Sequence, residues 1–292
     1  MTDPVAIRRL DFQGEPQLMG ILNVTPDSFS GDGLARERDI VAAAVDQAAG
    51  FLTDGAAILD LGGESTRPGA EPVSVQQEID RTAPAIAAIR ARFPDAVISI
   101  DSFKAETAAA ALDAGADWIN DVWGGRADEG MLSLAAARGC PIVLMHNRSK
   151  PGHAEIDRRL GASYVAPDYG DFLPEVLAEL QALAEAALAA GVRREKILLD
   201  PGVGFGKTVR QNMVLINALD HVKALGFPVL LGASRKSFIG KVLDVPADER
   251  VDGTAATTMV GVLRGADVIR VHDVRRMNQV MRMTRAILTA EA

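Results

Sequence analysis

Short apolar runs recur along the whole chain, and a segment with helical periodicity follows each of them. The runs are a few residues long, rich in Ile, Leu and Val, and end on a polar or hinge residue. They span 18–23, 57–62, 97–101, 118–121, 142–146, 197–200, 229–234 and 268–272. Their apolar positions are nearly continuous rather than alternating, which is typical of parallel strands buried on both faces. The pattern therefore predicts eight parallel strands.

The segments between these runs repeat apolar residues at helical spacing. Helices are expected over 40–53, 75–93, 105–114, 129–137, 173–190, 211–225, 252–263 and 274–288. Ser74 can cap the second helix, and Gly115 and Gly139 stand where helix C-termini favour glycine. Parallel strands need crossovers, usually helices, and eight such repeats can close on themselves. The sequence therefore predicts an α/β fold, a single (β/α)8 TIM barrel.

The domain organisation follows from the length of the chain and from the extents of the predicted elements and loops. A chain of 292 residues could form two domains, but α/β barrels routinely run about 200 to 250 residues or more as one unit. We expect a short N-terminal extension over 1–17, lying across one end of the barrel as an extended or hairpin segment, and a barrel over 18–289. The first two βα loops, 24–38 and 63–73, are long and favour functional lids. The long segment 147–171 is compatible with a further lid or with a surface excursion.

Composition and charge exclude several classes of protein. Hydrophobic residues make up 48% of the chain and charged residues 24%, which suits a folded core and gives no sign of disorder. A net charge of −8 and a pI near 5.1 argue against a nucleic-acid scaffold. No stretch approaches the roughly 20 apolar residues of a membrane span, and the N-terminus lacks a basic segment followed by an apolar one. Cys140 is the only cysteine, so we expect a cytoplasmic protein without an intrachain disulfide.

Polar residues stand at the ends of the predicted strands. Barrel closure would bring all strand ends to one rim, so that these distant residues face a common cleft. They are Asn23, Asp101, Asn120, Asp200 and His272. A helix N-cap or a strand-end hydrogen bond is the commoner role for an isolated aspartate at such a position. The combination of all five favours a binding site.

Seven motifs, in order from residue 20 to residue 273, carry a resemblance to a known family. They are GILNVTPDSFS at 20–30, GGESTRPG at 62–69, IDSFK at 100–104, INDV at 119–122, DPGVGFGK at 200–207, GASRKS at 232–237 and IRVHD at 269–273. With these motifs the chain resembles the dihydropteroate synthases. The resemblance implies a (β/α)8 barrel that condenses 6-hydroxymethyl-7,8-dihydropterin diphosphate with 4-aminobenzoate. The products would be 7,8-dihydropteroate, for folate synthesis, and diphosphate.

The strand-end residues suit a pterin. Its amino group and ring nitrogens lie along one edge and need buried acceptors, and a carboxylate can accept from two donors at once. The resemblance implies that Asp200 accepts from the 2-amino group and N3, and that Asp101 and Asn120 meet the other polar edge atoms. It also implies that Lys236 donates to the ring carbonyl region and that Arg270 stacks on the ring face.

A departing diphosphate needs positive charge and hydrogen-bond donors, because charge builds there in the transition state. Arg270 and His272 are two apart on one predicted strand and point to the same side. The resemblance implies that they bind the diphosphate with Thr66 and Arg67, and that Asn23 holds Mg²⁺. One amide oxygen can suffice, since Mg²⁺ keeps several waters and takes phosphate oxygens. The alternatives are a buried His272 imidazole satisfied by a neighbour and an Arg270 paired with Asp267 or Asp273.

The second substrate is an aromatic amine with a carboxylate. The resemblance places Phe29, Pro68, Phe205, Lys236 and Ser237 around it once the first two loops close. Its carboxylate would meet the Ser237 hydroxyl or a backbone N–H at a helix start, where anions are favoured. This subsite would therefore exist only in the closed state.

Two loops differ from known sequence patterns: the first in the position of its acid, and the glycine-rich one in its spacing. The family often has its acid one position before Asp32, and Asp32 is our candidate partner for Arg67 in the closed state. The glycine-rich stretch 201–208 fails the Walker spacing, because Pro201 stands five residues before Gly206. Its glycines would instead allow close approach to a flat ring, or simply form a turn.

The expected chemistry is a dissociative, SN1-like displacement without a covalent nucleophile, since the dihydropterin ring can spread positive charge. Two alternatives remain: a methyltetrahydrofolate-dependent methyltransferase, and a pterin-binding paralogue without catalytic activity. A methyltransferase needs no diphosphate subsite, so Arg67, Arg270 and His272 favour the synthase. The partners would be the two small-molecule substrates and, as the resemblance implies, a second copy of the chain in a homodimer through its late helices. Neither nucleic acid nor a membrane is expected.

Overall fold

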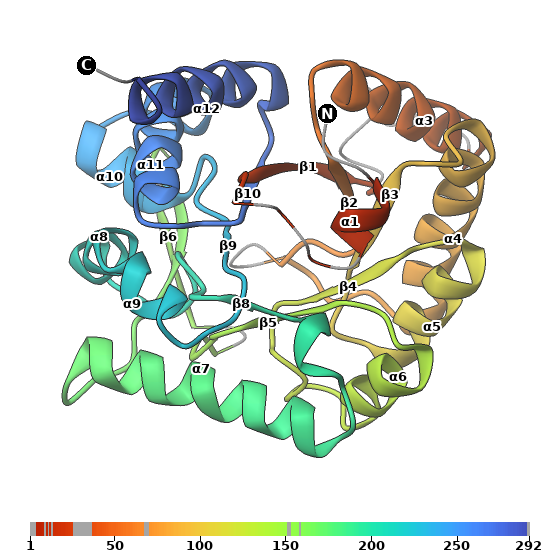
Figure 1. Ribbon diagram of the computed structural model, residues 1–292, viewed down its shortest axis with the longest axis horizontal. Coiled ribbons are helices and arrows are strands. Elements are labelled where there is room, and N and C mark those ends of the chain that lie inside the picture. Colours follow the sequence, from red (N-terminus) through yellow and green to blue (C-terminus); the bar gives the residue numbers. More distant parts are fainter. Residues whose placement is uncertain are drawn as a thin grey trace.

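The computed structural model describes residues 4–8, 10, 12, 14–25, 37–66, 70–150, 153–157 and 159–290. Within these residues, eight parallel strands form one sheet in the order β8-β5-β4-β3-β2-β1-β10-β9. The strands are β1 (Gln17–Asn23), β2 (Ile58–Gly62), β3 (Val97–Asp101), β4 (Trp118–Asp121), β5 (Ile142–Met145), β8 (Ile197–Asp200), β9 (Leu230–Leu231) and β10 (Val268–Val271). A parallel bridge between Leu199 and Val229 joins the two outer strands and closes the sheet (Figure 1). The predicted (β/α)8 barrel is confirmed.

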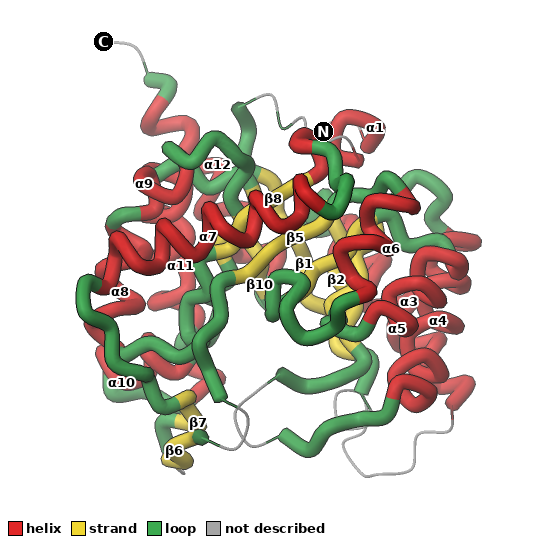
Figure 2. The backbone as a smooth tube through the Cα atoms, turned by 90° about the horizontal axis from the view of Figure 1, so that it is seen from below, coloured by secondary structure: helices red, strands yellow, loops and turns green. Residues whose placement is uncertain are grey.

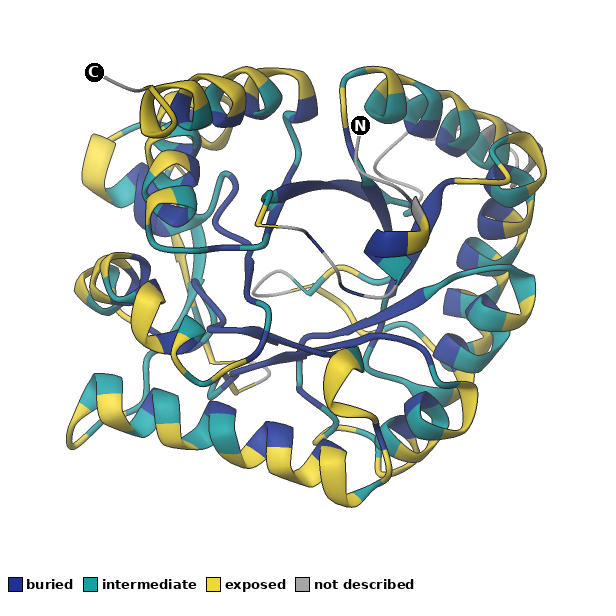
Figure 3. Cartoon of the chain, viewed as in Figure 1, coloured by how far each residue is buried: buried dark blue, intermediate teal, exposed yellow. Residues whose placement is uncertain are grey.

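Helices surround the barrel and bury one face each against it (Figure 3). They are α3 (Glu37–Thr53), α4 (Val75–Arg92), α5 (Ala105–Ala114), α6 (Gly130–Arg138), α7 (Phe172–Ala189), α8 (Val209–Asn217), α9 (Leu219–Lys223), α10 (Ser237–Leu243), α11 (Val251–Leu263) and α12 (Val274–Leu288). Short 3-10 turns are η1 (Arg194–Lys196) and η2 (Ala247–Glu249). Among the described residues, no helix is both long and apolar enough to cross a membrane.

The predicted boundaries and caps agree closely with most of these elements. Ser74 and Gln77 form a capping box at the start of α4, and Gly115 and Gly139 end α5 and α6 in the left-handed conformation. One prediction was wrong: the single helix expected over 211–225 is broken into α8 and α9 at Ala218, whose ψ of 23° leaves the helical range. The short helix α10 was not predicted.

Strand alternation sorts side chains into an outer and an inner layer. Leu59 and Leu61 of β2 pack outward against the helices, whereas Ile58 joins the apolar cluster inside the barrel. Because alternate residues of a strand point to opposite sides, Asp60 points inward above Ile58, and Asp101 points inward above Val97. The barrel interior is therefore apolar at the amino ends of the strands and polar at the carboxyl ends.

The N-terminal segment closes the apolar end of the barrel. It contains a short helix, α1 (Pro4–Arg8), where we had expected an extended or hairpin segment. Ile7, Leu10 and Phe12 pack into the inner apolar cluster, and Arg8 Nε donates to Asp117 at 2.9 Å. This packing leaves the opposite end, with the polar strand ends, for ligands.

The long segment after β5 forms an antiparallel hairpin of β6 (Ala154–Asp157) and β7 (Gly161–Tyr164). Figure 2 shows this hairpin at the end of the barrel opposite to α1. The segment is thus a structured excursion over the polar rim, an outcome that the sequence left open.

Candidate active site

A cluster of two carboxylates, an amide and an arginine lies inside the carboxyl-terminal half of the barrel. Asp60 Oδ2 accepts hydrogen bonds from Arg270 Nε at 2.6 Å and from Asn120 Nδ2 at 3.0 Å. Arg270 Nη2 also donates to Asp101 Oδ2 at 2.5 Å. Strand register sets this arrangement, because Gly62 pairs with Asp101 and Asp101 pairs with Asn120. Four strands thus contribute to one cluster.

Asp60 is the member that sequence reasoning missed. It is fully buried, and its Oδ1 has no hydrogen-bond partner among the described residues. A buried acceptor without a partner is costly, which points to a ligand donor at this place. The available signal was a single carboxylate inside an otherwise apolar strand, two residues before the strand end.

The electrostatics of the cluster are set by burial and by Arg270. Burial raises the pKa of Asp101 to about 7, although the guanidinium of Arg270 opposes the shift. Burial lowers the pKa of Arg270, but the charges of Asp60 and Asp101 outweigh it and hold that pKa above its ordinary value. Arg270 therefore stays charged and compensates the carboxylates.

Asp200 and Lys236 stand next to this cluster. Asp200 Oδ1 accepts from the backbone N–H of Gly202 at 2.7 Å, and burial raises its pKa against the pull of Lys236. Burial likewise lowers the pKa of Lys236 to about 8, while Asp200 opposes the shift. A Cβ built at Gly232 would lie 3.7 Å from Asp200 Oδ2 and 4.0 Å from the Arg270 Cβ. The rim therefore brings Asp200, Lys236 and Arg270 together.

At the end of β10, the structure excludes one alternative role of Arg270 and supports one contact of His272. Arg270 pairs with neither Asp267 nor Asp273, which bind Lys223 and Arg235 instead. His272 Nδ1 lies 3.0 Å from Ser234 Oγ, as expected for an imidazole satisfied by a neighbour, and the ring is half-buried rather than sealed. His272 is thus held by Ser234 at the end of β10.

The remaining predicted residues lie around the same rim. Asn23 ends β1 beside Gly62, and its amide has no hydrogen bond to a described residue. The Thr66 carbonyl accepts from the Tyr164 hydroxyl at 2.9 Å, and Ser237 is the first residue of α10. The Lys236 ammonium lies 4.6 Å from the centre of the Phe205 ring and donates to the Val203 carbonyl. Phe29, Asp32, Arg67 and Pro68 lie outside the described residues.

Two glycines of the loop after β8 pack against protein backbone. A Cβ at Gly202 would lie 1.8 Å from the His146 carbonyl oxygen, and Gly202 has φ +71°, so only glycine fits. A Cβ at Gly206 would meet the Ser149 backbone nitrogen at 2.7 Å. The turn-forming alternative therefore accounts for these two glycines.

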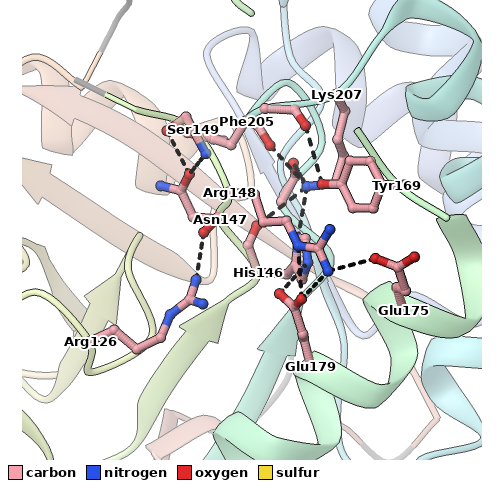
Figure 4. Close-up of polar contacts among 12 residues, drawn as sticks. Arg126, His146, Asn147, Arg148, Ser149, Tyr169, Glu175, Glu179, Phe205 and Lys207 are labelled. Atoms are coloured by element: carbon pink, nitrogen blue, oxygen red, sulfur yellow. Dashed lines mark hydrogen bonds and ion pairs between the residues drawn. The ribbon is translucent and has the colours of Figure 1, made fainter. Parts of the chain in front are cut away.

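A buried lysine closes that loop (Figure 4). Lys207 Nζ lies 2.9 Å from the Gly202 carbonyl, 3.0 Å from the Phe205 carbonyl and 3.0 Å from His146 Nδ1. Burial lowers the pKa of Lys207 to about 7, and burial together with Lys207 lowers that of His146 to about 2. His146 is therefore neutral, and its Nε2 lies 3.0 Å from Glu179. Lys207 therefore holds the loop.

The loop after β2 is fixed at both ends by one lysine. Lys104 Nζ bonds Glu64 Oε2 at 2.7 Å near the loop's beginning and the Val73 carbonyl at 2.7 Å near its end. It also lies 3.0 Å from buried Glu78. Both ends of the segment that carries Thr66 and Arg67 are therefore bound to the same side chain, Lys104.

The fold and the rim define a (β/α)8 barrel with a cluster of carboxylates, an amide and an arginine at the carboxyl ends of its strands. A family model described as pterin binding enzyme matches residues 19–272, so the chain belongs to the family of pterin-binding enzymes.

Its relatives extend over nearly the whole chain. It is 44% identical to the dihydropteroate synthase of Bacillus subtilis, over 96% of this chain and 91% of the relative, and 45% identical to that of Synechocystis, over 92% and 89%. The crystal structure of a Clostridium difficile dihydropteroate synthase in the presence of pteroic acid superposes with a TM-score of 0.85 at 40% identity, covering 94% of this chain and 98% of the other. A Xanthomonas albilineans dihydropteroate synthase with 4-aminobenzoic acid gives a TM-score of 0.85 at 39% identity, covering 95% and 94%.

Proposed function

We propose that the chain is a transferase of folate synthesis that catalyses the dihydropteroate synthase reaction. It joins the methylene carbon of 6-hydroxymethyl-7,8-dihydropterin diphosphate to the amine of 4-aminobenzoate and releases diphosphate. One observation supports this most strongly: the buried acceptors Asp60, Asn120 and Asp200 and the partly buried Asp101 lie on one rim beside the cation Arg270. Such a rim matches a heterocycle with several edge donors and an anionic leaving group.

The pterin subsite follows from these acceptors. Asp200 accepts from the 2-amino group and N3, while Asp101 and Asn120 meet the other edge atoms. The unpaired Oδ1 of Asp60 supplies a further buried acceptor. Lys236, whose ammonium interacts with Asp200, donates to the ring carbonyl, and the Arg270 guanidinium covers the ring face.

Pterin affinity should rise with pH between about 6 and 8. Burial raises the pKa of the Asp101 carboxyl to about 7, so this group becomes charged across this range. The charged carboxylate only accepts hydrogen bonds, whereas the protonated carboxyl uses one oxygen as a donor. Calorimetric titration with a pterin that lacks the diphosphate measures the effect. Asp101→Asn removes this protonation step and serves as the control for ionisation of the ligand itself. A wild-type affinity curve parallel to that of Asp101→Asn would contradict the assignment.

The diphosphate subsite lies at the other side of the ring. Arg270 and His272, together with Thr66 and Arg67, supply cations and donors where negative charge develops. Asn23 fits a Mg²⁺ ion because it ends β1 at the rim and carries an amide oxygen, and this ion needs few protein ligands when phosphate oxygens and waters complete its shell. When bound, Mg²⁺ offsets the charge of the leaving diphosphate.

The second substrate is held by the loops after β1, β2 and β8 and by the start of α10. Phe205, Lys236 and Ser237 contact the aminobenzoate, with Phe29 and Pro68 completing the subsite and Asp32 supporting Arg67. The reaction is dissociative: the carbon–oxygen bond to diphosphate breaks first, and the oriented amine then forms the carbon–nitrogen bond and loses a proton. The chain's contribution is binding, charge stabilisation and orientation, without a covalent nucleophile.

The function is tested by incubating the purified protein with the dihydropterin diphosphate, Mg²⁺ and labelled 4-aminobenzoate. Labelled dihydropteroate is the expected product. Pterin binding without product would indicate the non-catalytic paralogue, and methyl transfer from methyltetrahydrofolate to a corrinoid acceptor would indicate the methyltransferase.

We also propose a cytoplasmic homodimer formed through α11 and α12. Met259 and Leu263 of α11, and Met283 and Ile287 of α12, are exposed apolar residues at i, i+4 spacing on two helices that pack together. Large exposed apolar patches mark interaction sites, and these four side chains support an interface at these two helices. Light scattering should give twice the chain mass of 30.9 kDa.

The double substitution Met283→Glu and Ile287→Glu should shift the dimer to monomer. The matched change Met213→Glu on α8, also exposed, should not. A monomeric wild-type protein at micromolar concentration would refute the dimer.

A further inference from the structure

The β6–β7 hairpin adds an aromatic side chain to the wall of the proposed aminobenzoate subsite. The Tyr164 ring stacks on the Phe205 ring, with centroids 5.9 Å apart and 27° between the planes. The Lys236 ammonium lies 4.6 Å from the centre of the same Phe205 ring. The Phe205 ring therefore contacts the Tyr164 ring and the Lys236 ammonium, and its orientation depends on the hairpin.

The same tyrosine also reaches the loop after β2. Its hydroxyl donates to the Thr66 carbonyl at 2.9 Å, although the two residues are 98 positions apart. Burial raises the pKa of Tyr164, so the hydroxyl remains a donor near neutral pH. Thr66 directly precedes Arg67. One side chain thus joins the loop that carries Arg67 to the loop that carries Phe205.

Hydrogen bonds from other parts of the barrel fix the position of the hairpin and therefore of Tyr164. Lys241 Nζ of α10 donates to Ser163 Oγ at 2.9 Å, and Arg250 Nη2 donates to the Leu160 carbonyl at 2.8 Å. A cavity of about 370 Å³ lies between the hairpin, the loop after β8 and α10, and both Tyr164 and Ser237 line it. Tyr164 is therefore placed relative to the proposed site of the aminobenzoate carboxylate.

We propose that Tyr164 is a positioning residue for the second substrate. Its ring orients Phe205 against the aminobenzoate, and its hydroxyl holds Thr66 in place. The pterin acceptors come from the barrel strands and do not depend on the hairpin. Tyr164 therefore acts on recognition of 4-aminobenzoate and leaves pterin binding unchanged. This inference rests on the proposed synthase function.

The test separates the two contacts of Tyr164. Tyr164→Phe keeps the ring stack and removes only the hydroxyl, so it should raise KM for 4-aminobenzoate roughly five-fold, the value of one hydrogen bond. Tyr164→Ala removes both contacts and should raise it by about 10- to 50-fold. Calorimetric affinity for a pterin should change by less than about two-fold in either variant, since no pterin contact is lost.

Two further variants sharpen the test. Ile156 lies on the same hairpin, and its side chain is 76% exposed. Ile156→Ala should leave the KM for 4-aminobenzoate and the affinity for a pterin unchanged. Phe205→Ala combined with Tyr164→Ala should be less than additive, because the two rings act through one contact. Thermal unfolding checks that every variant is folded.

The outcomes separate the two proposals. An active wild-type enzyme whose tyrosine variants keep a normal KM for 4-aminobenzoate would overturn the inference alone. Equal losses of affinity for 4-aminobenzoate and for a pterin without diphosphate would also overturn it, because they would show general damage to the fold. A wild-type protein that forms no dihydropteroate would refute the proposed function and, with it, this role of Tyr164.

Discussion

Asp200→Ala should weaken pterin binding by about 10²- to 10⁴-fold. The buried Asp200 carboxylate is proposed to accept from two ligand donors, and each charge-assisted hydrogen bond contributes about 1.5 to 3 kcal/mol. Removing the acceptor leaves both ligand donors without a partner inside the barrel. Asp200→Asn keeps the shape and one acceptor, so its loss should be intermediate. Calorimetric titration with a pterin measures these affinities.

The matching variant of the diphosphate subsite is Arg67→Ala. It should leave the affinity for a pterin unchanged and lower the turnover number, because Arg67 is proposed to contact only the leaving group. Asp220→Ala, on the exposed surface of α9, is the control and should change neither quantity. Equal losses of pterin affinity in Asp200→Ala and Arg67→Ala would contradict the division into subsites.

Arg270→Met should be the most damaging single change, because it affects both stability and catalysis. The substitution leaves the carboxylates of Asp60 and Asp101 buried beside an apolar side chain, and breaking a buried ion pair costs about 3 to 5 kcal/mol. It also removes the cation nearest the departing diphosphate, which should lower kcat/KM by about 10²- to 10³-fold. Urea unfolding and steady-state kinetics measure the two effects.

The instability of Arg270→Met should depend on pH. Arg270 opposes the upward shift of the Asp101 pKa, so its loss raises that pKa further above the ordinary value of 3.8. The folded protein then binds more protons than the unfolded chain between the two pKa values. The free energy of unfolding therefore falls as pH rises through this window, and the variant should be less stable at pH 8 than at pH 5.

A second substitution distinguishes charge from packing. Adding Asp60→Asn to Arg270→Met removes one uncompensated carboxylate, so it should restore part of the stability and none of the activity. Arg264→Met breaks an exposed ion pair with Asp220 and an exposed hydrogen bond to Asn217, and it should cost less than about 1 kcal/mol. If the double variant is no more stable than Arg270→Met, the instability does not come from buried charge.

The site shows where sequence reasoning succeeds and where it stops. Asp101 and Asp200 were found because they end apolar runs, and Asn120 because it stands one residue before such an end; a strand end is visible in the local pattern. Asp60 was missed because it lies within a run, where a carboxylate looks like an exception rather than a signal. Only the inward direction of its side chain, shared with Asp101, reveals its role.

The hairpin escaped prediction for a different reason. Its strands have no clear apolar alternation, and Ile156 is largely exposed. The hairpin is held by partners from elsewhere, among them Lys241 and Arg250. Contacts of this kind leave no periodic trace in the segment itself, so the sequence could not choose between a lid and a surface excursion.

The sequence by itself determined the eight strands, most of the helices and the polar character of the strand ends, because hydrophobic periodicity and capping act between near neighbours in the chain. Only the tertiary structure decided which charges meet. Arg270 pairs with Asp60 and Asp101, 210 and 169 residues away, while its sequence neighbours Asp267 and Asp273 bind other cations. Barrel closure and strand register fix those distances, and neither is encoded in any single segment.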